Sequence, residues 1–208
     1  MRVLPYGARA AMVDFDDPSE VLGLHASLEQ DPPDGVVELV PAARTLLVRF
    51  DPGRTHHDRL AGSILDRSTV DIAPREAAEI VVPVRYDGPD LADVAAAAGL
   101  SAEAVVRRHE DGTYVSAFCG FAPGFAYLTG LDPALHMPRR SSPRTRVPAG
   151  SVAIAGEYTA VYPHASPGGW QLIGRTTLPV WDVERDPPNL LTPGTRIRFS
   201  GSSDLSRR

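Results

Sequence analysis

The chain has 208 residues, a net charge of −5 and 43% hydrophobic residues, which is typical of a globular protein with a packed core. This acidity argues against a nucleic-acid partner, because phosphate contacts need clustered positive charge, and no run of about 20 apolar residues that could cross a bilayer occurs. We therefore expect no membrane association and a cytoplasmic location, in which the single cysteine, Cys119, forms no internal disulfide.

All 21 basic residues are arginine, and lysine is absent. A Walker-type phosphate loop needs a lysine that reaches the terminal phosphates, so the chain contains no such loop. Schiff-base chemistry on a lysine and a biotinylated lysine are excluded for the same reason.

The first part of the chain predicts alternating strands and helices. Strands are expected over 10–15, 36–40 and 46–50, with the last two joined in a hairpin by residues 41–44. Helices are expected after Asp17 and after Thr55, because each of these capping residues is followed three positions later by an acidic residue. The order strand, helix, two strands, helix predicts a small α+β domain of the ferredoxin-like type.

The pattern changes between Ile72 and Val81, where we expect a domain boundary that separates an α+β domain over 1–76 from a β-barrel domain over 77–208. Pro83 interrupts the expected strand 79–86 and favours an edge position or a bulge. Two short helices are expected, capped by Asp90 and Ser101. Short strand-like runs separated by proline and glycine follow and predict a β-barrel: 114–119, 151–155, 159–162, 170–174 and 196–200.

The stretch from Gly120 to Leu128 reads Gly-Phe-Ala-Pro-Gly-Phe-Ala-Tyr-Leu. Its glycines and proline set turns, and Phe121 and Phe125 fill a core or, where they are exposed, supply the centre of an interface with a partner. Gly124, close to the phenol of Tyr127, favours the approach of a ligand to the backbone.

The second informative stretch runs from Pro138 to Thr176. Four arginines within eight residues lie between prolines, and they predict a stiff, positively charged loop that binds carboxylate or phosphate, or else a solvated loop paired with acidic residues. The run Ser166-Pro167-Gly168-Gly169 predicts either an anion-binding nest of backbone N–H groups or a plain tight turn.

Other candidate sites are weak. The adjacent residues His56 and His57 point in different directions and lack further ligands at metal-binding spacing, so no metal site is predicted. The sequence has no Gly-x-Ser-x-Gly elbow, which argues against a serine hydrolase. Cys119 lies in an apolar run and is expected to be an inert buried thiol rather than a nucleophile. His164 is expected at the surface rather than as a catalytic base. The catalytic residue stays unassigned.

The segment from Gly120 to Leu128 resembles the Gly-Phe-x-Pro-Gly-Phe-x-Tyr-Leu signature of the KipI-like family, which is also called the B subunit of 5-oxoprolinase and was formerly called allophanate hydrolase subunit 1. The rest of the signature is resembled, in order, by the segments Pro143-Arg144, 147–152, Ala155-Gly156, Tyr162-Pro163 and 166–176 of this chain. Glu157-Tyr158 and Ala160 depart from the Gln-Thr-Gly type of turn that is expected in the family.

This resemblance implies a ferredoxin-like N-terminal domain followed by a cyclophilin-like β-barrel. It implies an ATP-dependent 5-oxoprolinase complex that opens 5-oxoproline to L-glutamate and in which this chain is inactive alone. The implied partners are a protein like the C subunit, similar to the other half of a carboxyltransferase domain, and the A subunit. ATP is then a co-substrate of the complex.

Two alternatives to this function stay open. One is half of a biotin-dependent carboxyltransferase of the urea carboxylase or allophanate type, which acts on another small amide. The other is a non-enzymatic inhibitor of a sensor histidine kinase.

Within the main expectation, Arg144, Arg146 and Arg175 bind a substrate carboxylate or phosphate. Arg175 is expected in a partly desolvated setting, on the same strand face as Gln171 if no bulge intervenes. The alternative for Arg175 is a structural ion pair inside the barrel. The full set of candidate binding residues is Tyr127, Arg144, Arg146, Ser151, Ser166, Gly168, Gly169, Trp170, Gln171 and Arg175, with Gly168 and Gly169 as backbone donors and Tyr127, Trp170 and Gln171 as pocket walls.

Overall fold

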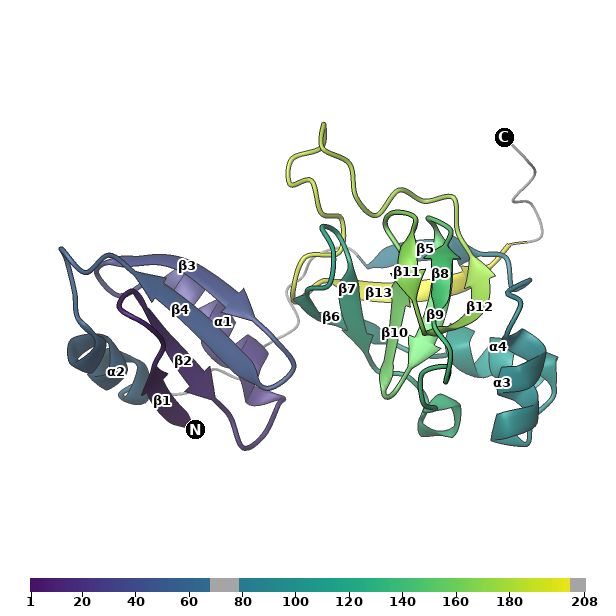
Figure 1. Ribbon diagram of the computed structural model, residues 1–208, viewed down its shortest axis with the longest axis horizontal. Helices are drawn as coiled ribbons and strands as arrows, with labels where there is room; N and C mark the ends of the chain where they lie inside the picture. The colour runs from purple at the N-terminus through teal and green to yellow at the C-terminus, as the bar shows by residue number, and fades with distance from the viewer. Residues whose placement is uncertain (68–78, 203–208) are drawn as a thin grey trace. The chain divides into compact units, whose positions relative to one another are not determined.

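The computed structural model describes residues 1–67 and 79–202 of the chain (Figure 1). The chain forms two compact units, Met1–Arg75 and Glu76–Arg208, each with a hydrophobic core of its own. The residues 68–78 lie outside the described part of the chain, and most of the segment expected to hold the domain boundary falls among them.

The first unit is a four-stranded antiparallel sheet with two helices, an α+β arrangement as predicted. Its sheet order is β1-β2-β4-β3. Alternate residues of β4, Leu46, Val48 and Phe50, are buried, and they pack with apolar residues of both helices such as Leu24 and Ile64. The elements are β1 Arg2–Pro5, β2 Ala10–Asp14, α1 Glu20–Gln30, β3 Val36–Pro41, β4 Thr45–Phe50 and α2 His57–Leu65.

Two details of this unit differ from the sequence prediction. The strand β1 was not predicted. It is short, its residues are mostly exposed, and it pairs with β2 at the sheet edge. The helix starts also differ, because Ser19 and His56 occupy the capping positions and neither side chain makes a capping hydrogen bond. Asp17 instead accepts a hydrogen bond from the N–H of Ser19, a local turn that competes with capping.

The second unit is built on a seven-stranded sheet of order β12-β9-β10-β7-β6-β13-β5. Its strands are β5 Ile80–Val84, β6 Tyr114–Cys119, β7 Ala126–Thr129, β9 Ser151–Ala155, β10 Tyr158–Val161, β12 Gln171–Arg175 and β13 Arg196–Gly201. The pair β13–β5 is parallel and the other pairs are antiparallel. Pro83 lies on β5, the last strand in this order, in agreement with the predicted edge position.

The two ends of this sheet meet and nearly close it into a barrel. Arg85, just after β5, exchanges two backbone hydrogen bonds of 2.8 and 2.9 Å with Arg175 at the end of β12. The N–H groups of Gly88 and Asp90 continue the contact to the carbonyls of Ile173 and Leu172. We call residues 85–90 together with 172–175 the seam.

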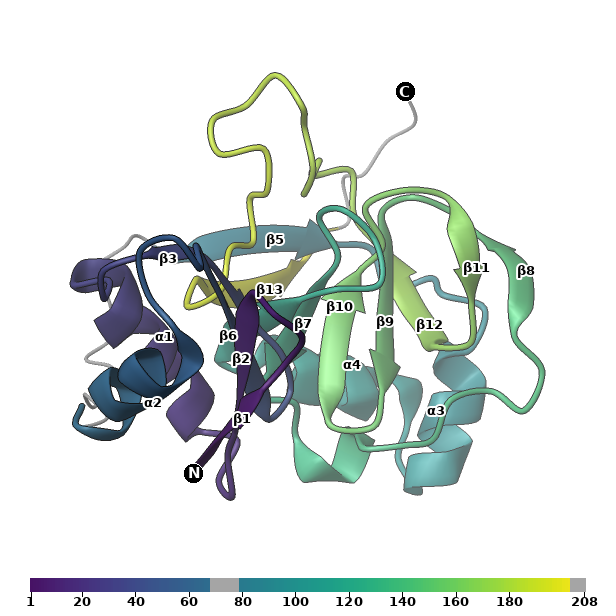
Figure 2. The ribbon, with the colours of Figure 1, turned by 60° about the vertical axis from the view of Figure 1, so that its left-hand side comes forward.

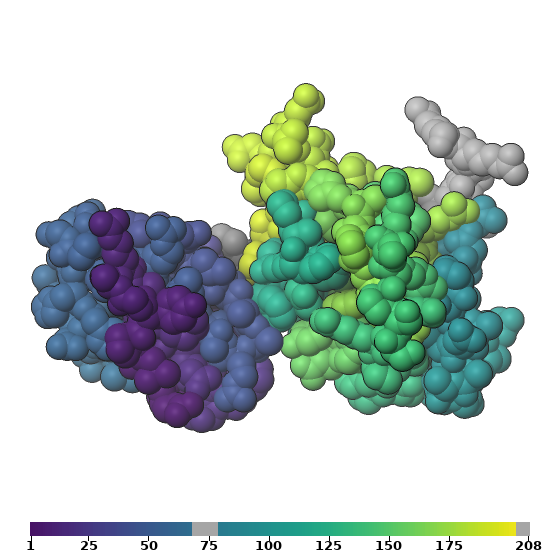
Figure 3. Space-filling view, viewed as in Figure 1, coloured from purple at the N-terminus to yellow at the C-terminus, as the bar shows by residue number. Residues whose placement is uncertain are grey.

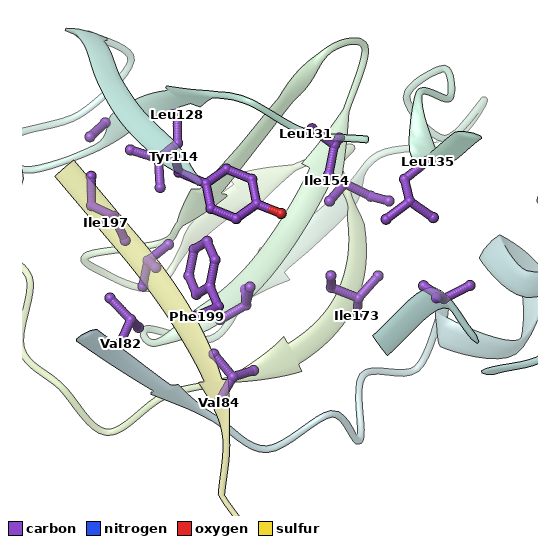
Figure 4. Close-up of a cluster of buried hydrophobic side chains, with 14 of the residues drawn as sticks. Val82, Val84, Tyr114, Leu128, Leu131, Leu135, Ile154, Ile173, Ile197 and Phe199 are labelled. Atoms are coloured by element: carbon purple, nitrogen blue, oxygen red, sulfur yellow. The ribbon is translucent and has the colours of Figure 1, made fainter. Parts of the chain in front are cut away.

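The barrel interior holds the larger hydrophobic core of the unit (Figure 4). The rings of Tyr114 and Phe199 meet edge to face at its centre, 5.1 Å apart, and Ile154 and Ile173 close one side. Two helices, α3 Leu91–Ala98 and α4 Ala102–Glu110, lie at one end of the barrel (Figure 1). Ser101 caps α4 and Gly99 ends α3 in a left-handed conformation.

A smaller core lies outside the barrel, where a two-stranded antiparallel sheet of β8 Arg144–Val147 and β11 Ser166–Gly168 lies beside the larger sheet (Figure 2). Phe125, Tyr162 and Trp170 are its buried aromatic residues. The sequence predicted a stiff loop for the arginine-rich stretch and a nest or tight turn for 166–169; residues 138–143 are irregular as expected, but 144–147 and 166–168 are strands. The backbone pairing of β8 with β11 makes them strands despite their proline and glycine.

The segment 176–195 between β12 and β13 contains no further strand and projects from the unit in the space-filling view (Figure 3). Trp181 anchors it against the loop at Gly124, where an added Cβ would lie 2.6 Å from the Cβ of Trp181. Among residues 1–67 and 79–202, no helix is long and apolar enough to cross a membrane.

Candidate functional site

A single buried carboxylate organises two of the four clustered arginines. The side chain of Asp90 is only 2% exposed, and Arg144 donates to both of its oxygens at 2.7 and 2.9 Å. Arg140 donates to Oδ1 at 2.8 Å, and the N–H of Leu172 donates to Oδ2 at 2.7 Å. Asp90 thus occupies the donor fork of Arg144, in agreement with the alternative in which the arginines of this segment pair with acidic residues.

Asp90 stands at the N-cap position of α3, but its side chain makes no capping hydrogen bond. The predicted cap is therefore an ion-pair centre instead. Burial is the largest influence on the pKa of Asp90 and by itself raises it. The hydrogen bonds from Arg144 and Leu172, together with the charges of Arg144 and Arg140, outweigh burial and lower this pKa below its ordinary value. Asp90 is therefore ionised at neutral pH.

A pocket of about 530 Å³ opens on the seam. It brings together four of the ten predicted site residues, and Asp87 and Gly88 also line it. Ser151 is buried there and donates its hydroxyl to the carbonyl of Pro148 at 2.8 Å. The lining residues are Asp87, Gly88, Pro89, Arg144, Arg146, Pro148, Ala149, Ser151, Leu172, Gly174 and Arg175.

Arg175 reaches this pocket through a bulge in β12. The register shifts between Leu172 and Gly174, so that Gln171 pairs with Ile154 and Arg175 pairs with Ser151. Directly paired residues share a sheet face, and Ile154 and Ser151 are three positions apart on β9. Gln171 and Arg175 therefore lie on opposite faces, contrary to the prediction made for a regular strand.

The guanidinium of Arg175 is exposed rather than desolvated. Its side chain is 58% exposed and donates to Oδ2 of Asp87 at 2.8 Å. Arg85 approaches the same oxygen, with its Nε at 3.0 Å. Arg175 thus forms an ion pair with a carboxylate of the protein itself, in a solvated rather than a partly desolvated setting.

Arg146 differs from its neighbours because its side chain has no partner. It is exposed on β8, and within the part of the chain that the structure describes it forms no ion pair and no side-chain hydrogen bond. Arg146 is therefore the guanidinium in this pocket that is free to bind an anion.

The other predicted residues do not line the pocket. Trp170 is 5% exposed in the outer core, and Tyr127 packs against it with ring centroids 5.6 Å apart. Gln171 donates to the carbonyl of Pro138 at 3.2 Å. Ser166 and Gly168 belong to β11, and Gly169 accepts a hydrogen bond from the N–H of Arg140 at 2.7 Å through its carbonyl, so the predicted nest of donors is replaced by strand pairing.

Sequence reasoning missed Asp87 as a site residue and gave Asp90 only a capping role. The run Asp87-Gly88-Pro89-Asp90 is typical of a turn before a helix, and this local pattern hid the pairing of its carboxylates with arginines more than 50 residues away. An excess of arginine without neighbouring acids in 138–146 is the one signal that pointed to distant acidic partners.

Cys119 remains a thiol. Burial raises its pKa, and Asn189 donates to its Sγ at 3.1 Å. His164 is exposed, as predicted. The residues that the structure describes include no group of three or more His, Cys, Asp or Glu that could hold a metal ion.

The fold belongs to a known class. The family described as "Carboxyltransferase domain, subdomain C and D" matches residues 1–191, and the chain belongs to this family. It is 39% identical to the B subunit of 5-oxoprolinase from Bacillus subtilis strain 168, over 93% of this chain and 89% of that protein. It is 55% identical to the same protein of Escherichia coli O157:H7, over 60% of this chain and 58% of that protein. The resemblance to the KipI-like, 5-oxoprolinase family is thereby confirmed.

Solved structures show the same fold. The crystal structure of TTHA0988 superposes with a TM-score of 0.82 and 38% identity, covering 97% of this chain and 41% of that longer one. The urea amidolyase of K. lactis, at 20% identity, superposes with a TM-score of 0.71 over 98% of this chain and 16% of that one, which shows a shared fold. The matched region thus spans less than two thirds of some of its relatives.

Proposed function

We propose that this chain is the B subunit of an ATP-dependent 5-oxoprolinase complex that opens 5-oxoproline to L-glutamate. The observation that carries the proposal is the 39% identity to a protein of that name over 93% of the chain. A protein like the C subunit, together with the A subunit, completes the complex, and the chain alone is inactive. Its location is the cytoplasm, where these partners and ATP would meet it.

The chemistry of such a complex has two parts. ATP transfers its terminal phosphoryl group to the oxygen of the lactam carbonyl, which makes the ring carbon electrophilic. Water then adds to that carbon, and the C–N bond breaks as the nitrogen takes up a proton, which leaves an acyl phosphate. A second water hydrolyses this acyl phosphate, and the products are glutamate, inorganic phosphate and the ADP left by the phosphoryl transfer. If phosphate binds to this chain, arginine and backbone N–H groups hold it, because the chain contains no lysine.

The proposal also assigns a fold type to each of the two units. Four antiparallel strands and two helices, with β1 at the edge, support a ferredoxin-like first domain over 1–76. The nearly closed seven-stranded sheet supports a cyclophilin-like barrel over 77–208. Limited proteolysis followed by mass spectrometry tests the division: cleavage between the two domains supports it, and cleavage within both before any cut between Ile72 and Val81 contradicts it.

Coexpression with the two partner proteins encoded by the same genome tests the activity. The purified complex should release glutamate from 5-oxoproline only when ATP is present, while the chain alone should be silent. Turnover by the isolated chain would contradict the proposed division of labour. A complex without any 5-oxoproline turnover would contradict the substrate.

The second candidate is half of a biotin-dependent carboxyltransferase. It is favoured by the similarity of 62 residues, at 42% identity, to the urea amidolyase of Lachancea kluyveri. The two candidates separate in one assay, because carboxyl transfer requires a biotinylated carrier protein and ring opening does not. A requirement for biotin in the reconstituted complex would replace the first proposal by the second.

A further inference from the structure

We propose that the pocket on the seam is an oxyanion-binding site in which Arg146 and Arg175 are the ligating residues. Asp87 holds Arg175 while the site is empty and competes with the incoming anion for it. The inference of an anion site rests on the geometry alone. The identity of the anion as a substrate group rests on the proposed function.

The distribution of charge supports an anion rather than a cation. Two guanidiniums share each carboxylate: Arg140 and Arg144 share Asp90, while Arg85 and Arg175 share Asp87. Arg146 has no partner in the described structure. Three positive charges therefore remain in excess around one pocket of a chain whose net charge is −5. Such a local excess attracts anions to the site.

The two carboxylates have different roles because they differ in burial. Asp90 is 2% exposed, and its pair with Arg144 is fixed by two hydrogen bonds. Asp87 is 33% exposed, and Arg175 is 58% exposed, so solvent screens their attraction. An exposed ion pair contributes little stability, and a ligand oxyanion can replace Asp87 at low cost.

The walls of the pocket match a small ligand. Its volume of about 530 Å³ lies within the range of small-molecule sites. Gly174 lets the backbone at Arg85 approach β12 closely, because a Cβ there would lie 2.7 Å from the carbonyl oxygen of Arg85. The wall formed by Pro148, Ala149 and Leu172 offers apolar surface for the carbon atoms of a ring. This combination fits an anion carried on a compact apolar body.

Within the proposed function, two groups have this chemistry: the carboxylate of 5-oxoproline and a phosphate of the nucleotide. Arginine binds either group through two parallel hydrogen bonds. The shared prediction is an oxyanion held by Arg146 and Arg175, and the two sources are separated by the choice of probe.

The test uses the full chain without partners, followed by NMR of the arginine side-chain N–H groups at low ionic strength. Four probes are titrated: 5-oxoproline, its analogue 2-pyrrolidinone without the carboxylate, inorganic phosphate, and ATP. We expect at least one oxyanion to shift the signals of Arg146 and Arg175, and 2-pyrrolidinone to bind much more weakly. Stronger binding of 5-oxoproline identifies the carboxylate as the ligand, and stronger binding of phosphate and ATP identifies the nucleotide.

Variants decide whether the pocket is responsible. Arg146→Gln and Arg175→Gln should each weaken binding about tenfold, because each removes a charge-assisted pair of hydrogen bonds. Asp87→Asn should strengthen binding several-fold, because it removes the competing anion. Arg198→Gln is the matched control, since Arg198 is a similarly exposed arginine of the same unit paired with Glu79 at 2.9 Å, and it should leave binding unchanged.

The proposal is overturned if the two arginine variants bind as the wild type does, or if Asp87→Asn weakens binding. The outcome for the proposed function is separate. Anion binding as expected together with a complex that does not open 5-oxoproline leaves the site intact and removes the function. In the opposite case, the Arg146→Gln and Arg175→Gln variants leave anion binding by the free chain unchanged, and complexes that contain them open 5-oxoproline with an unchanged KM. This result removes the site and keeps the function.

Discussion

Arg85 and Arg175 are paired twice, once through their backbones and once through a shared carboxylate. Their N–H and carbonyl groups exchange hydrogen bonds of 2.8 and 2.9 Å, which joins the end of β5 to the end of β12. Their guanidiniums both lie against Oδ2 of Asp87. The contact that closes the barrel is therefore also the contact that positions the charged wall of the pocket.

Gly174→Ala should destabilise the protein, because the backbones of β12 and the seam approach too closely for a side chain. The added Cβ would lie 2.7 Å from the carbonyl oxygen of Arg85 and 2.9 Å from a methyl group of Val84. We expect a loss of about 1–3 kcal/mol in the free energy of unfolding, measured in urea. Gly120→Ala is the control, since its Cβ would meet only the ring of Tyr127 at an ordinary 3.8 Å. Equal losses for both variants would contradict this account.

Asp90→Asn should destabilise the protein by about 2–3 kcal/mol, because it leaves Arg140 and Arg144 without their counter-charge in a partly buried site. Asp93→Asn, on the exposed face of the same helix, should cost less than about 1 kcal/mol. The pKa of Asp90 is lowered in the folded state, so its contribution is present above the ordinary pKa of an aspartate and is lost as the pH falls. Chemical unfolding at pH 7 should separate the two variants clearly, and equal small losses would show that the ion-pair centre contributes nothing.

His109 should make the folded state sensitive to acid. Burial lowers its pKa to about 3, and the neutral ring bridges Tyr86 at 2.8 Å and Thr159 at 2.9 Å. The hydroxyl of Thr159 donates to the carbonyl of Ala153, so Nε2 of His109 donates to Thr159 and Nδ1 accepts from Tyr86.

The unfolded chain takes up a proton near pH 6.5 and the folded chain does not. The contribution of His109 to stability is therefore complete above pH 6.5 and is lost progressively down to about pH 3. Between pH 6.5 and pH 5 this amounts to about 2 kcal/mol. His109→Gln should flatten this part of the curve of unfolding free energy against pH, whereas exposed His164→Gln should leave the slope unchanged. A curve of unaltered slope in His109→Gln would contradict the assignment.

Phe121 should contribute to partner binding more than to folding. It is 62% exposed and has a φ of 67°, a left-handed conformation that bulky residues rarely adopt. Phe125, the other predicted interface residue, is 1% exposed and belongs to the core instead. Phe121→Gly should change the unfolding free energy of the isolated chain by less than about 1 kcal/mol, because relief of strain offsets the lost ring contact and the added chain entropy.

The same variant should weaken binding of the partner protein that resembles the C subunit. We expect a loss of about tenfold or more, measured by calorimetry after light scattering has confirmed the wild-type complex. Val81→Ala, which shortens an exposed apolar residue on β5, provides the control and should bind normally. Unchanged affinity in Phe121→Gly would place the interface elsewhere on the molecule.

The parts of the fold that depend on local pattern were predictable. Alternation in Leu46, Val48 and Phe50 identified a strand, and Ser101 identified the start of a helix. The short strands β1, β8 and β11 were not predictable, because each has only three or four residues, most of them are not buried, and their partners are chosen by tertiary contacts.

The candidate site was predictable in part. The sequence named the arginines but not their partners, because the carboxylates of Asp87 and Asp90 come from a distant segment. The sequence prediction placed Arg175 on the same face as Gln171, which holds only for a regular strand. The bulge after Leu172 moves Arg175 to the opposite face. A single inserted position of this kind leaves no trace in composition or periodicity.

The parallel pairing of β5 with β13 has a consequence for the order of folding during synthesis. Ile80 pairs with Ile197, and β13 lies between β6 and β5 in the sheet. A ribosome must therefore translate about 110 residues beyond β5 before that strand acquires its neighbour, and until then the barrel stays open with unpaired strand edges. The nascent unit thus depends on β13, and chains released before residue 196 should be captured by chaperones or proteases rather than reach a native barrel.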